Sequence, residues 1–222
     1  MLLIQILFII LAYLIGSIPF GFLVGKLKGI DIRKVGSKNI GATNTGRALG
    51  KKFAVLVYFL DMLKGALLVA LFRYNVIPQE FCVLNPMLYG ILACLGHSFP
   101  IFLKFKGGKC VSCGSGAAAA YFPPLLLIAA LTFLISVITT KMVSIGSMLG
   151  ASAVFISALI LSLVTKETML NLNTLPDGFW PYNLWFITIT FLIVCLIIIK
   201  HTPNIKRIIA GTENKIGQNK SK

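Results

Sequence analysis

Apolar runs long enough to cross a lipid bilayer recur along almost the whole chain. They fall at about residues 2–25, 53–73, 85–103, 110–140, 143–164 and 183–200. The hydrocarbon core of a bilayer is about 30 Å thick, and a helix of roughly 20 apolar residues spans it. The chain is 57% hydrophobic and only 12% charged, whereas about a quarter of the residues are charged in ordinary globular domains. These features predict an all-α, polytopic integral membrane protein in which residues 1–222 form a single membrane-embedded domain.

The run 110–140 is too long to cross a membrane as one helix, because it would extend roughly 46 Å at 1.5 Å per residue. Pro123 and Pro124 would also interrupt its backbone hydrogen bonding. We therefore divide it into a short helix at 110–122 and a second helix at 124–140. The chain then has about seven transmembrane helices, of which the fourth is short.

The first apolar run is predicted to be a retained span and not a signal peptide. It lacks the basic segment with which a signal peptide opens, it is long, and it contains Gly16, Ser17 and Pro19. We therefore count residues 2–25 as the first transmembrane helix.

Positive charge is concentrated in a few loops. Lys and Arg total 21 against 6 Asp and Glu, which gives a formal net charge of +15. The loop 26–52 and the tail from Lys200 are basic, while 166–183 contains little positive charge. Because basic loops of membrane proteins face the cytoplasm, seven helices place the N-terminus outside and the C-terminus inside. Membrane topology alone is the alternative explanation for most of this charge.

The acidic and sulfur-containing residues do not form a recognisable metal or disulfide pattern. The five cysteines are scattered and odd in number, so no disulfide framework is expected. Cys110 and Cys113 form a CxxC pair, but neither the other ligands of a zinc site nor the βαβ setting of a redox motif accompanies them. We therefore expect no metal and no cofactor.

The segment Gly107 to Lys109 forms a basic bend directly before the short helix at 110–122. Backbone N–H groups at such a bend and the positive end of the helix dipole bind phosphate, and the lysine adds a positive charge. The stretch is not a Walker A loop, because Leu103 stands where that loop has glycine and Cys110 where it has Ser or Thr. We interpret the bend as a candidate anion site, with a glycine turn and lipid-anchoring lysines as the alternative.

Two other segments on the predicted cytoplasmic side combine cations with small or amide residues. In VGSKNIGATNTGRALGKK, at 35–52, hydroxyl and amide side chains stand among glycines that permit positive φ and close backbone approach. In KHTPNIKRIIAGTE, at 200–213, the spacing of His201, Asn204 and Arg207 places them near one side of a helix. Both segments are therefore candidates for binding an anionic substrate.

Several single residues are further candidates, each with a structural alternative. His97 and His201 fall near predicted cytoplasmic ends of spans, and each could instead be a packed residue. Asp61 and Lys64 lie within the second span, where ionisable residues mark functional sites, or they form a structural ion pair. Ser144 stands at a helix start, which is a good anion position, or it bonds back to a helix carbonyl.

Three blocks, GSKNIGATNTGR, GHSFPIFLKFKGGK and KHTPNIKRIIAGTE, occur in this order along the chain. Together they resemble the three cytoplasmic motifs of the acyl-phosphate:glycerol-3-phosphate acyltransferases of bacterial membranes, the PlsY family. The resemblance covers the chain from Gly16 to Glu213. It implies a small seven-helix protein of the bacterial cell (inner) membrane whose active site faces the cytoplasm.

The motifs, together with the residues singled out above, give one candidate site. The catalytic candidates are His201, Asn204 and Ser144. The candidates for binding substrate are Ser37, Asn39, Thr43, Asn44, Arg47, Lys64, His97, Lys104, Gly107, Gly108, Lys109, Arg207 and Glu213. The second block departs from the family pattern GGKGVAT, because Cys110 stands where a third glycine is usual and Cys113 where threonine is usual.

The resemblance implies that the 1-hydroxyl of glycerol 3-phosphate attacks an acyl phosphate, giving lysophosphatidic acid and phosphate in the first step of phospholipid synthesis. Because phosphate is a good leaving group, positioning and charge stabilisation matter more than a strong nucleophile. His201 is the best side-chain candidate for the general base, and a substrate phosphate is the alternative. The expected partners are acyl phosphate, glycerol 3-phosphate, the lipid bilayer and a peripheral enzyme that forms acyl phosphate, with no nucleic acid.

Three other functions were weighed. An acyl-CoA acyltransferase of the HxxxxD kind is disfavoured, because Phe102 and Lys206 stand five residues after the two histidines. A CDP-alcohol phosphotransferase needs clustered aspartates for metal ions, and the six acids of this chain are spread along it. A transporter or channel for organic phosphates would also use basic, glycine-broken helices, but the two halves of the chain show no internal similarity.

Overall fold

A computed structural model describes residues 1–83, 85–163 and 184–217, and all the regular secondary structure in these residues is helical. The all-α prediction is therefore confirmed. The chain divides into two compact units, Met1–Tyr121 and Phe122–Lys222. The segment 166–183, which is expected outside, lies outside the described residues, as do Lys220 and Lys222 of the tail.

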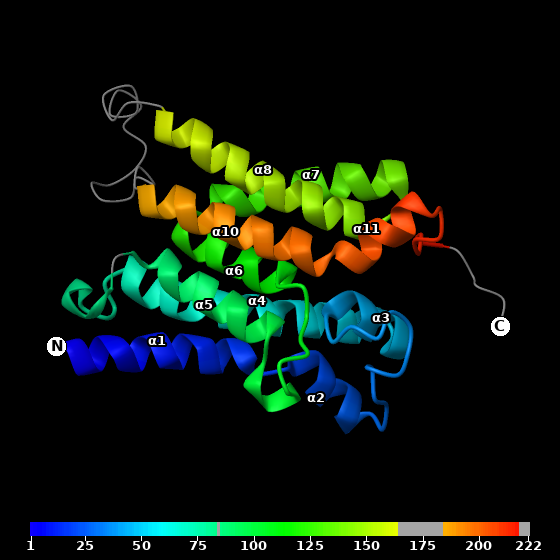
Figure 1. Ribbon diagram of the computed structural model, residues 1–222, viewed down its shortest axis with the longest axis horizontal. Coiled ribbons are helices and arrows are strands. Elements are labelled where there is room, and N and C mark those ends of the chain that lie inside the picture. Colours follow the sequence, from blue (N-terminus) through cyan, green and yellow to red (C-terminus); the bar gives the residue numbers. More distant parts are fainter. Residues whose placement is uncertain (84, 164–183, 218–222) are drawn as a thin grey trace. The chain divides into compact units, whose positions relative to one another are not determined.

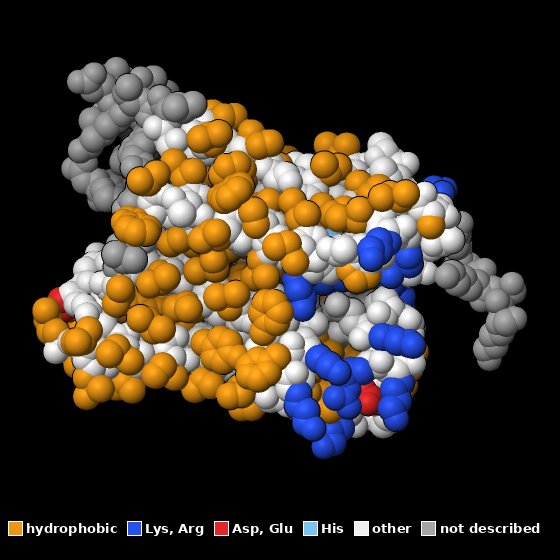
Figure 2. Space-filling model, in the orientation of Figure 1, with side chains coloured by type: hydrophobic (Ala, Val, Ile, Leu, Met, Phe, Trp, Pro, Cys, Tyr) orange, Lys and Arg blue, Asp and Glu red, His pale blue; other side chains and the backbone are white. Residues whose placement is uncertain are grey.

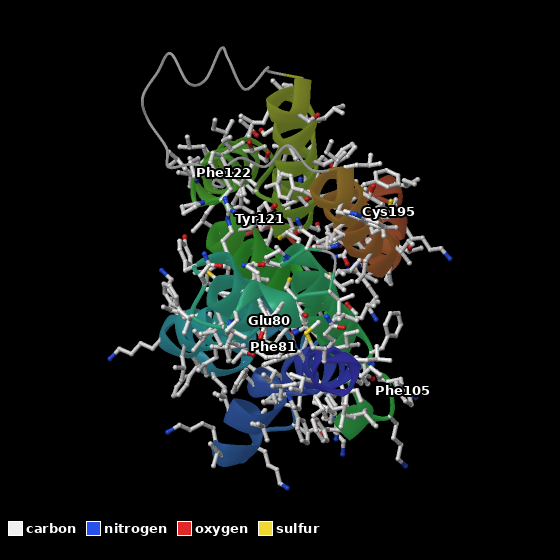
Figure 3. The ribbon with its side chains drawn as sticks, turned by 90° about the vertical axis from the view of Figure 1, so that its left-hand side faces the viewer. Glu80, Phe81, Phe105, Tyr121, Phe122 and Cys195 are labelled. Atoms are coloured by element: carbon white, nitrogen blue, oxygen red, sulfur yellow. The ribbon has the colours of Figure 1, made fainter. Side chains whose placement is uncertain are left out.

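The first unit contains six α-helices among its described residues. They are α1 (Leu2–Ser17), α2 (Phe20–Leu27), α3 (Ala42–Leu49), α4 (Lys51–Arg73), α5 (Met87–Ser98) and α6 (Val111–Tyr121), with 3₁₀ turns η1 (Gln79–Phe81) and η2 (Ile101–Leu103). Helices α1 and α5 pack together, as do α4 and α6, so segments far apart in sequence are neighbours (Figure 1). Figure 3 shows Glu80 and Phe81 in the η1 turn, where Gln5 Nε2 donates to the Glu80 carbonyl oxygen at 3.0 Å.

The first predicted span is broken, which corrects the expectation of one continuous helix at 2–25. Helix α1 ends at Ser17 and α2 begins at Phe20, with a bend of 40° between them. Pro19 has no N–H to continue the helical ladder. The carbonyl of Ile18, at the break, instead accepts a hydrogen bond from Lys64 Nζ at 2.8 Å. The break therefore has a polar partner in the middle of an apolar unit.

Small residues let the helices of the first unit approach closely. A Cβ on Gly16 of α1 would overlap the backbone of Ala93 in α5, and one on Gly116 of α6 would overlap the carbonyl of Met62 in α4. Such close backbone contact is typical of helices that pack within membranes, where van der Waals contact replaces the hydrophobic effect. The rings of Phe72 and Tyr89 stack between α4 and α5 with centroids 4.5 Å apart.

The second unit contains four α-helices among its described residues: α7 (Pro124–Thr140), α8 (Val143–Leu163), α10 (Leu184–Lys200) and α11 (Thr202–Ile209). Pro123 and Pro124 begin α7, which confirms the predicted division of the run 110–140. Lys141, with φ of 59°, closes the tight turn between α7 and α8. Helix α11 leaves α10 at an angle of 54°, and His201 lies at the bend.

Each of the seven predicted apolar segments carries a helix within the described residues. Helices α4 and α8 are long and apolar enough to cross one, and the number rises to four if α1 with α2 and α10 with α11 are each one bent span. Helix α6 has 11 residues, as expected for the short fourth helix. The number of crossings therefore stays a prediction.

The surface carries large exposed apolar side chains, among them Leu7, Leu63 and Phe102. Figure 2 shows hydrophobic side chains over much of the face in view. In the first unit, Lys and Arg side chains gather over α2 and the loop that follows it (Figure 2). Exposed apolar residues of this size are ordinary for a surface that contacts lipid and rare on a water-exposed one.

Candidate functional site

The loop before α3 is organised by one buried amide side chain. Asn44, which is 1% exposed, donates from Nδ2 to the carbonyl oxygens of Ile32, Val35 and Asn39 at 2.9–3.1 Å. Its Oδ1 accepts a hydrogen bond from the backbone N–H of Ser37 at 2.8 Å. Because an amide nitrogen has two hydrogens, these three carbonyls already use its donor capacity. Asn44 therefore holds the loop in shape.

The other predicted residues of the first block lie around this amide. Gly36 has φ of 57°, and a Cβ there would press on Asn44 Oδ1, so glycine is required at this point. Asn39 Oδ1 accepts from the Gly41 N–H at 2.8 Å, which shapes the entry to α3. Thr43 and Arg47 are exposed on α3. Helix α3 thus presents a hydroxyl and a guanidinium at the surface, next to the loop that Asn44 holds by hydrogen bonds.

The loop between η2 and α6 carries Gly107, Gly108 and Lys109, and packs directly on His97. The Gly108 N–H donates to the His97 carbonyl at 2.9 Å. A Cβ on Gly108 would overlap the His97 ring at Nε2, and one on Gly107 would overlap the His97 carbonyl. Both glycines are therefore needed for close approach to His97. Neither glycine has a positive φ, so the fold requires their small size and not a left-handed backbone conformation.

The positive φ angles in this loop belong to residues with side chains. They occur at Lys104 (52°), Phe105 (61°) and Cys110 (52°). Phe105 lies on the stretch between η2 and α6 (Figure 3). Cys110 is thus in the left-handed region at the position where the resembling family has glycine, and a Cβ there costs about 1–2 kcal/mol of conformational free energy.

Three thiols meet beneath the loop. Cys94 of α5 lies close to Cys110 and Cys113, and all three are buried. Cys113 also lies against α4, because a Cβ on Gly65 would overlap its carbonyl and approach its Sγ. The thiol at the position where threonine is usual is therefore part of the packing between α4 and α6.

A buried charged group lies in α4 beside the same loop. Lys64 Nζ is 2.8 Å from Asp61 Oδ1, and His97 Nδ1 is 3.6 Å from the same oxygen. All three side chains are almost completely buried. The ion pair predicted as an alternative for Asp61 and Lys64 is present, and His97 is added to it. The sequence predicted either a functional site or an ion pair for Asp61 and Lys64, and nothing in the spacing of the residues pointed to His97.

In the second unit, His201 lies at the bend between α10 and α11 and is 2% exposed. Its Nδ1 lies 2.8 Å from the carbonyl oxygen of Ile197. Since a carbonyl only accepts, the neutral ring carries its proton on Nδ1 and its lone pair on Nε2. His201 therefore has the tautomer that a general base acting from Nε2 requires.

One carboxylate connects four of the predicted residues of this unit. Glu213 Oε1 accepts hydrogen bonds from Ser144 Oγ at 2.9 Å and from Asn204 Nδ2 at 2.7 Å. Its Oε2 accepts from Arg207 Nε at 2.7 Å. Asn204 and Arg207 thus share one side of α11, as their spacing predicted, and Ser144 bonds to Glu213 and not to a helix carbonyl. Ser17, by contrast, does bond back to a helix carbonyl, that of Tyr13.

The environment of Glu213 favours its charged form. Burial raises the pKa of this carboxyl, but hydrogen bonds from Asn204, Ser144 and Arg207 and the Arg207 charge outweigh burial, so the pKa is lowered from its ordinary value of 4.5. The residues after it are also held, because the Ile216 N–H donates to the Lys141 carbonyl at 2.8 Å. The segment 213–216 therefore closes against the start of α8.

Comparison with known proteins decides the family. The sequence profile described as glycerol-3-phosphate acyltransferase matches residues 6–211. The chain belongs to the glycerol-3-phosphate acyltransferase family. The family member of Acholeplasma laidlawii is 41% identical over 226 residues, which cover 97% of this chain and 96% of the relative. That of Bacillus subtilis is 42% identical over 212 residues, which cover 95% and 96%.

Solved structures from the glycerol-3-phosphate acyltransferase family agree with this assignment. A crystal structure of PlsY, an integral membrane glycerol 3-phosphate acyltransferase, in its glycerol 3-phosphate form matches the chain with a TM-score of 0.78 at 34% identity, over 96% of each chain. The lysophosphatidic acid form of PlsY matches with a TM-score of 0.76 at 33% identity, over 96% of this chain and 95% of that one. The resemblance inferred from the three sequence blocks is confirmed, and the chain is a membrane protein.

Most candidate residues of this acyltransferase-family chain form three clusters, two in the first unit and one in the second. In the first unit the structure brings together Lys64, His97, Gly107 and Gly108, and it places Ser37, Asn39 and Asn44 in a second cluster. Lys109 is half-buried at the start of α6, and Lys104 is exposed. In the second unit it brings together Ser144, Asn204, Arg207 and Glu213. The roles of these residues are taken up below as proposals.

Proposed function

We propose that the protein is a glycerol-3-phosphate acyltransferase that uses acyl phosphate as its acyl donor. It transfers the acyl group to the 1-hydroxyl of glycerol 3-phosphate and forms lysophosphatidic acid, in the first step of phospholipid synthesis. The observation that carries the proposal is the match over 96% of both chains to PlsY in its glycerol 3-phosphate form. The lysophosphatidic acid form of the same relative names the proposed product.

The reaction is a simple exchange of one acyl–oxygen bond for another. The 1-hydroxyl oxygen of glycerol 3-phosphate attacks the acyl carbonyl carbon, the bond from that carbon to the phosphate oxygen breaks, and phosphate leaves with the electron pair. The hydroxyl proton goes to a base. Because the leaving group is already good, the protein contributes mainly by orienting two anionic substrates and stabilising the charge on the carbonyl oxygen.

The residues of the first unit are proposed to bind phosphate groups. Gly107, Gly108 and Lys109 stand at the N-terminus of α6, where backbone N–H groups and the helix dipole favour an anion. Further donors are provided by Thr43 and Arg47 on α3 and by the stretch Ser37 to Asn39. Lys104 precedes Gly107 in the second block and is proposed to bind substrate as well. Asn44 is proposed to contribute indirectly, by holding the loop that carries them.

The residues of the second unit are proposed to handle the proton. His201 has its lone pair on Nε2 and is the side-chain candidate for the base, while an oxygen of a substrate phosphate is the alternative acceptor. Ser144 and Asn204 both donate hydrogen bonds to Glu213. This carboxylate is proposed to fix the positions from which the two side chains act in catalysis. Arg207 is proposed to contact substrate while balancing the Glu213 charge.

The proposed enzyme works as one membrane-embedded domain, because the family profile matches residues from both units. We place it in the bacterial cell (inner) membrane with seven membrane-associated helices, an external N-terminus and an active site open to the cytoplasm. The basic loop 26–52 and the basic tail support this orientation. A peripheral enzyme that forms acyl phosphate is the proposed source of the donor.

A donor assay tests the proposal. Purified protein in detergent, given glycerol 3-phosphate and palmitoyl phosphate without added metal, should form lysophosphatidic acid and phosphate in equal amounts. Lys109→Ala should lower turnover roughly 10-fold to 100-fold, since a hydrogen bond to a charged group contributes about 1.5–3 kcal/mol. Lys106→Ala, an exposed lysine of the same loop, is the matched control and should keep near-normal turnover.

Two results would overturn it. Robust activity with acyl-CoA and none with acyl phosphate would refute the donor. Absence of turnover with either donor, together with movement of glycerol 3-phosphate across reconstituted vesicles, would favour a transporter of organic phosphates.

A further inference from the structure

Helix α4 carries a buried acid to which the proposed reaction assigns no role. Asp61 is 1% exposed, and its Oδ1 lies 2.8 Å from Lys64 Nζ and 3.6 Å from His97 Nδ1. Neutralising a buried aspartate requires one cation, which Lys64 supplies. The imidazole of His97, 3.6 Å from the same oxygen, is more than neutralisation requires, so Asp61 also contacts the end of α5.

We propose that Asp61 is a positioning residue for the phosphate-binding loop at 107–109, and that it acts through His97. The proposal rests on the proposed function only in assuming that this loop binds a phosphate group. Asp61 itself touches no substrate in this proposal. Its effect is to fix the His97 ring, against which the loop is built.

Contacts of His97 connect Asp61 to the loop. The carbonyl of His97 accepts the hydrogen bond of the Gly108 N–H at 2.9 Å. The ring stands where any Cβ on Gly108 would be, since that Cβ would overlap Nε2, Cδ2 and Cε1. The carbonyl blocks a Cβ on Gly107 in the same way. A rotation of the ring would therefore move the backbone of the loop that is proposed to hold the phosphate.

Lys64 connects Asp61 to a different part of the unit. Lys64 Nζ donates to the Ile18 carbonyl at 2.8 Å, and it lies 5.6 Å from the centre of the Phe20 ring. Ile18 belongs to the break between α1 and α2. The charged group therefore joins α4 to the α1–α2 break through Lys64 and to the end of α5 through His97. An anchored carboxylate of this kind is suited to hold a ring in one orientation.

Two variants separate positioning from simple charge balance. Removing one member of a buried pair leaves an uncompensated charge, whereas replacing both members by uncharged groups of similar volume is often neutral for stability. The double variant Asp61→Asn/Lys64→Met should therefore fold, while losing the contact on His97. The variant His97→Gln keeps the ion pair and removes the ring. Asp31→Asn/Arg33→Met, which removes an exposed pair joined at 2.8 Å, is the matched control.

The readouts are the thermal unfolding midpoint, the Kd for inorganic phosphate by titration calorimetry, and the KM and kcat of acyl transfer. Both test variants should bind phosphate about tenfold more weakly than wild type, the equivalent of about one lost hydrogen bond. The KM of the phosphate-bearing substrate should rise more than kcat falls, whereas a smaller folded fraction would lower kcat alone. The control should match wild type.

The triple variant, which combines all three substitutions, tests whether Asp61 acts through His97. Residues acting in one chain of contacts are not additive, so the triple variant should be no weaker than His97→Gln alone. Losses that add would mean that Lys64 binds phosphate directly, and would overturn the proposal. If the double variant does not fold, wild-type phosphate affinity in His97→Gln would overturn it equally.

The proposed reaction and this inference fail in different ways. Wild-type protein that binds phosphate more tightly than both variants, yet transfers no acyl group, would refute the reaction and support the positioning role. Active wild-type protein whose variants keep the same KM and phosphate Kd would refute the positioning role and leave the reaction in place. Wild-type protein with no measurable phosphate binding would overturn the inference.

Discussion

Asn44 in the first unit and Glu213 in the second are both buried side chains that hold several partners, but they hold different kinds of group. Asn44 is neutral and bonds to four backbone groups of the loop before α3. Glu213 is charged and bonds to three side chains from two other segments. The first fixes the path of a loop, and the second fixes the orientation of functional side chains.

The difference follows from what each group can offer. A carboxylate only accepts hydrogen bonds, and bonds to an ionised acceptor are roughly twice as strong as neutral ones. It therefore suits a cluster of donors such as a hydroxyl, an amide and a guanidinium. An amide both donates and accepts, so it can satisfy carbonyls and an N–H of irregular backbone without any charge. The two clusters should consequently respond differently to charge substitution and to pH.

Replacing the neutral amide of Asn44 by a carboxylate should have the largest effect. Asn44→Asp places a second oxygen against the carbonyls of Ile32, Val35 and Asn39, where the amide now donates. Loss of these bonds and the repulsion should lower the free energy of unfolding by at least about 3 kcal/mol. Thermal unfolding in detergent measures it. Asn39→Ala, which removes one bond to the Gly41 N–H, should cost only about 1 kcal/mol. Equal losses in the two variants would contradict the central role of Asn44.

Replacing the charged Glu213 of the second unit by a neutral amide should affect activity more than stability. Glu213→Gln keeps the shape but replaces one acceptor oxygen by a donor, so one of Ser144, Asn204 or Arg207 loses its partner. We expect a loss of about 2 kcal/mol in transition-state stabilisation, roughly 30-fold in kcat/KM. Steady-state kinetics measure it. A variant with normal kcat/KM would show that Glu213 does not position these side chains for catalysis.

The loop at 107–110 packs on the buried His97 ring, and the backbone conformation of the loop itself should add a second contribution to its stability. Cys110 has φ of 52°. Comparing Cys110→Gly with Cys110→Ala isolates the conformational cost of the positive φ, because both substitutions remove the thiol. The glycine variant should be more stable by about 1 kcal/mol, the reverse of the usual order. Unfolding midpoints decide it, and an alanine variant at least as stable as the glycine variant would show that the loop is not strained there.

The pH response should be the smallest effect, and it should appear only in the second unit. Folding lowers the pKa of Glu213, so its stabilisation is fully present above the ordinary value of 4.5 and is lost as pH falls through the native pKa. The difference in unfolding midpoint between wild type and Glu213→Gln should therefore shrink below about pH 4.5. The difference between wild type and Asn39→Ala should stay constant over the same range. A constant Glu213 difference down to pH 3 would contradict the linkage.

The length and composition of the apolar runs predicted the helices, because a bilayer imposes both on any chain that crosses it. The prolines at 123 and 124 predicted the division of the fourth run in the same physical way. Pro19 indicates a break between α1 and α2 by the same steric rule, although the apolar run 2–25 by itself predicts one span. Local steric rules thus account for most of the fold.

Contacts between distant segments could not be predicted in the same way. Ser144 and Glu213 are 69 residues apart, and no spacing rule connects them. The i, i+3 spacing of Asp61 and Lys64 suggested their ion pair, but His97 comes from another helix. The glycines at 107 and 108 indicated a bend that offers backbone N–H groups to an anion, and the sequence did not show that their small size is needed for packing on His97. Motif resemblance named most of the candidate residues, and only the packing of helices shows which ones support which.

The bond from Lys64 to the Ile18 carbonyl bears on how the protein is inserted into its membrane. A ribosome delivers the chain N-terminal end first, so α1 and the break after it reach the bilayer before α4 does. A lysine entering a bilayer without a partner is costly. Asp61 lies on the same helix as Lys64, and the Ile18 carbonyl at the α1–α2 break, which is synthesised earlier, accepts the hydrogen bond of the lysine. The carbonyl that accepts the hydrogen bond of Lys64 is therefore synthesised before Lys64 itself.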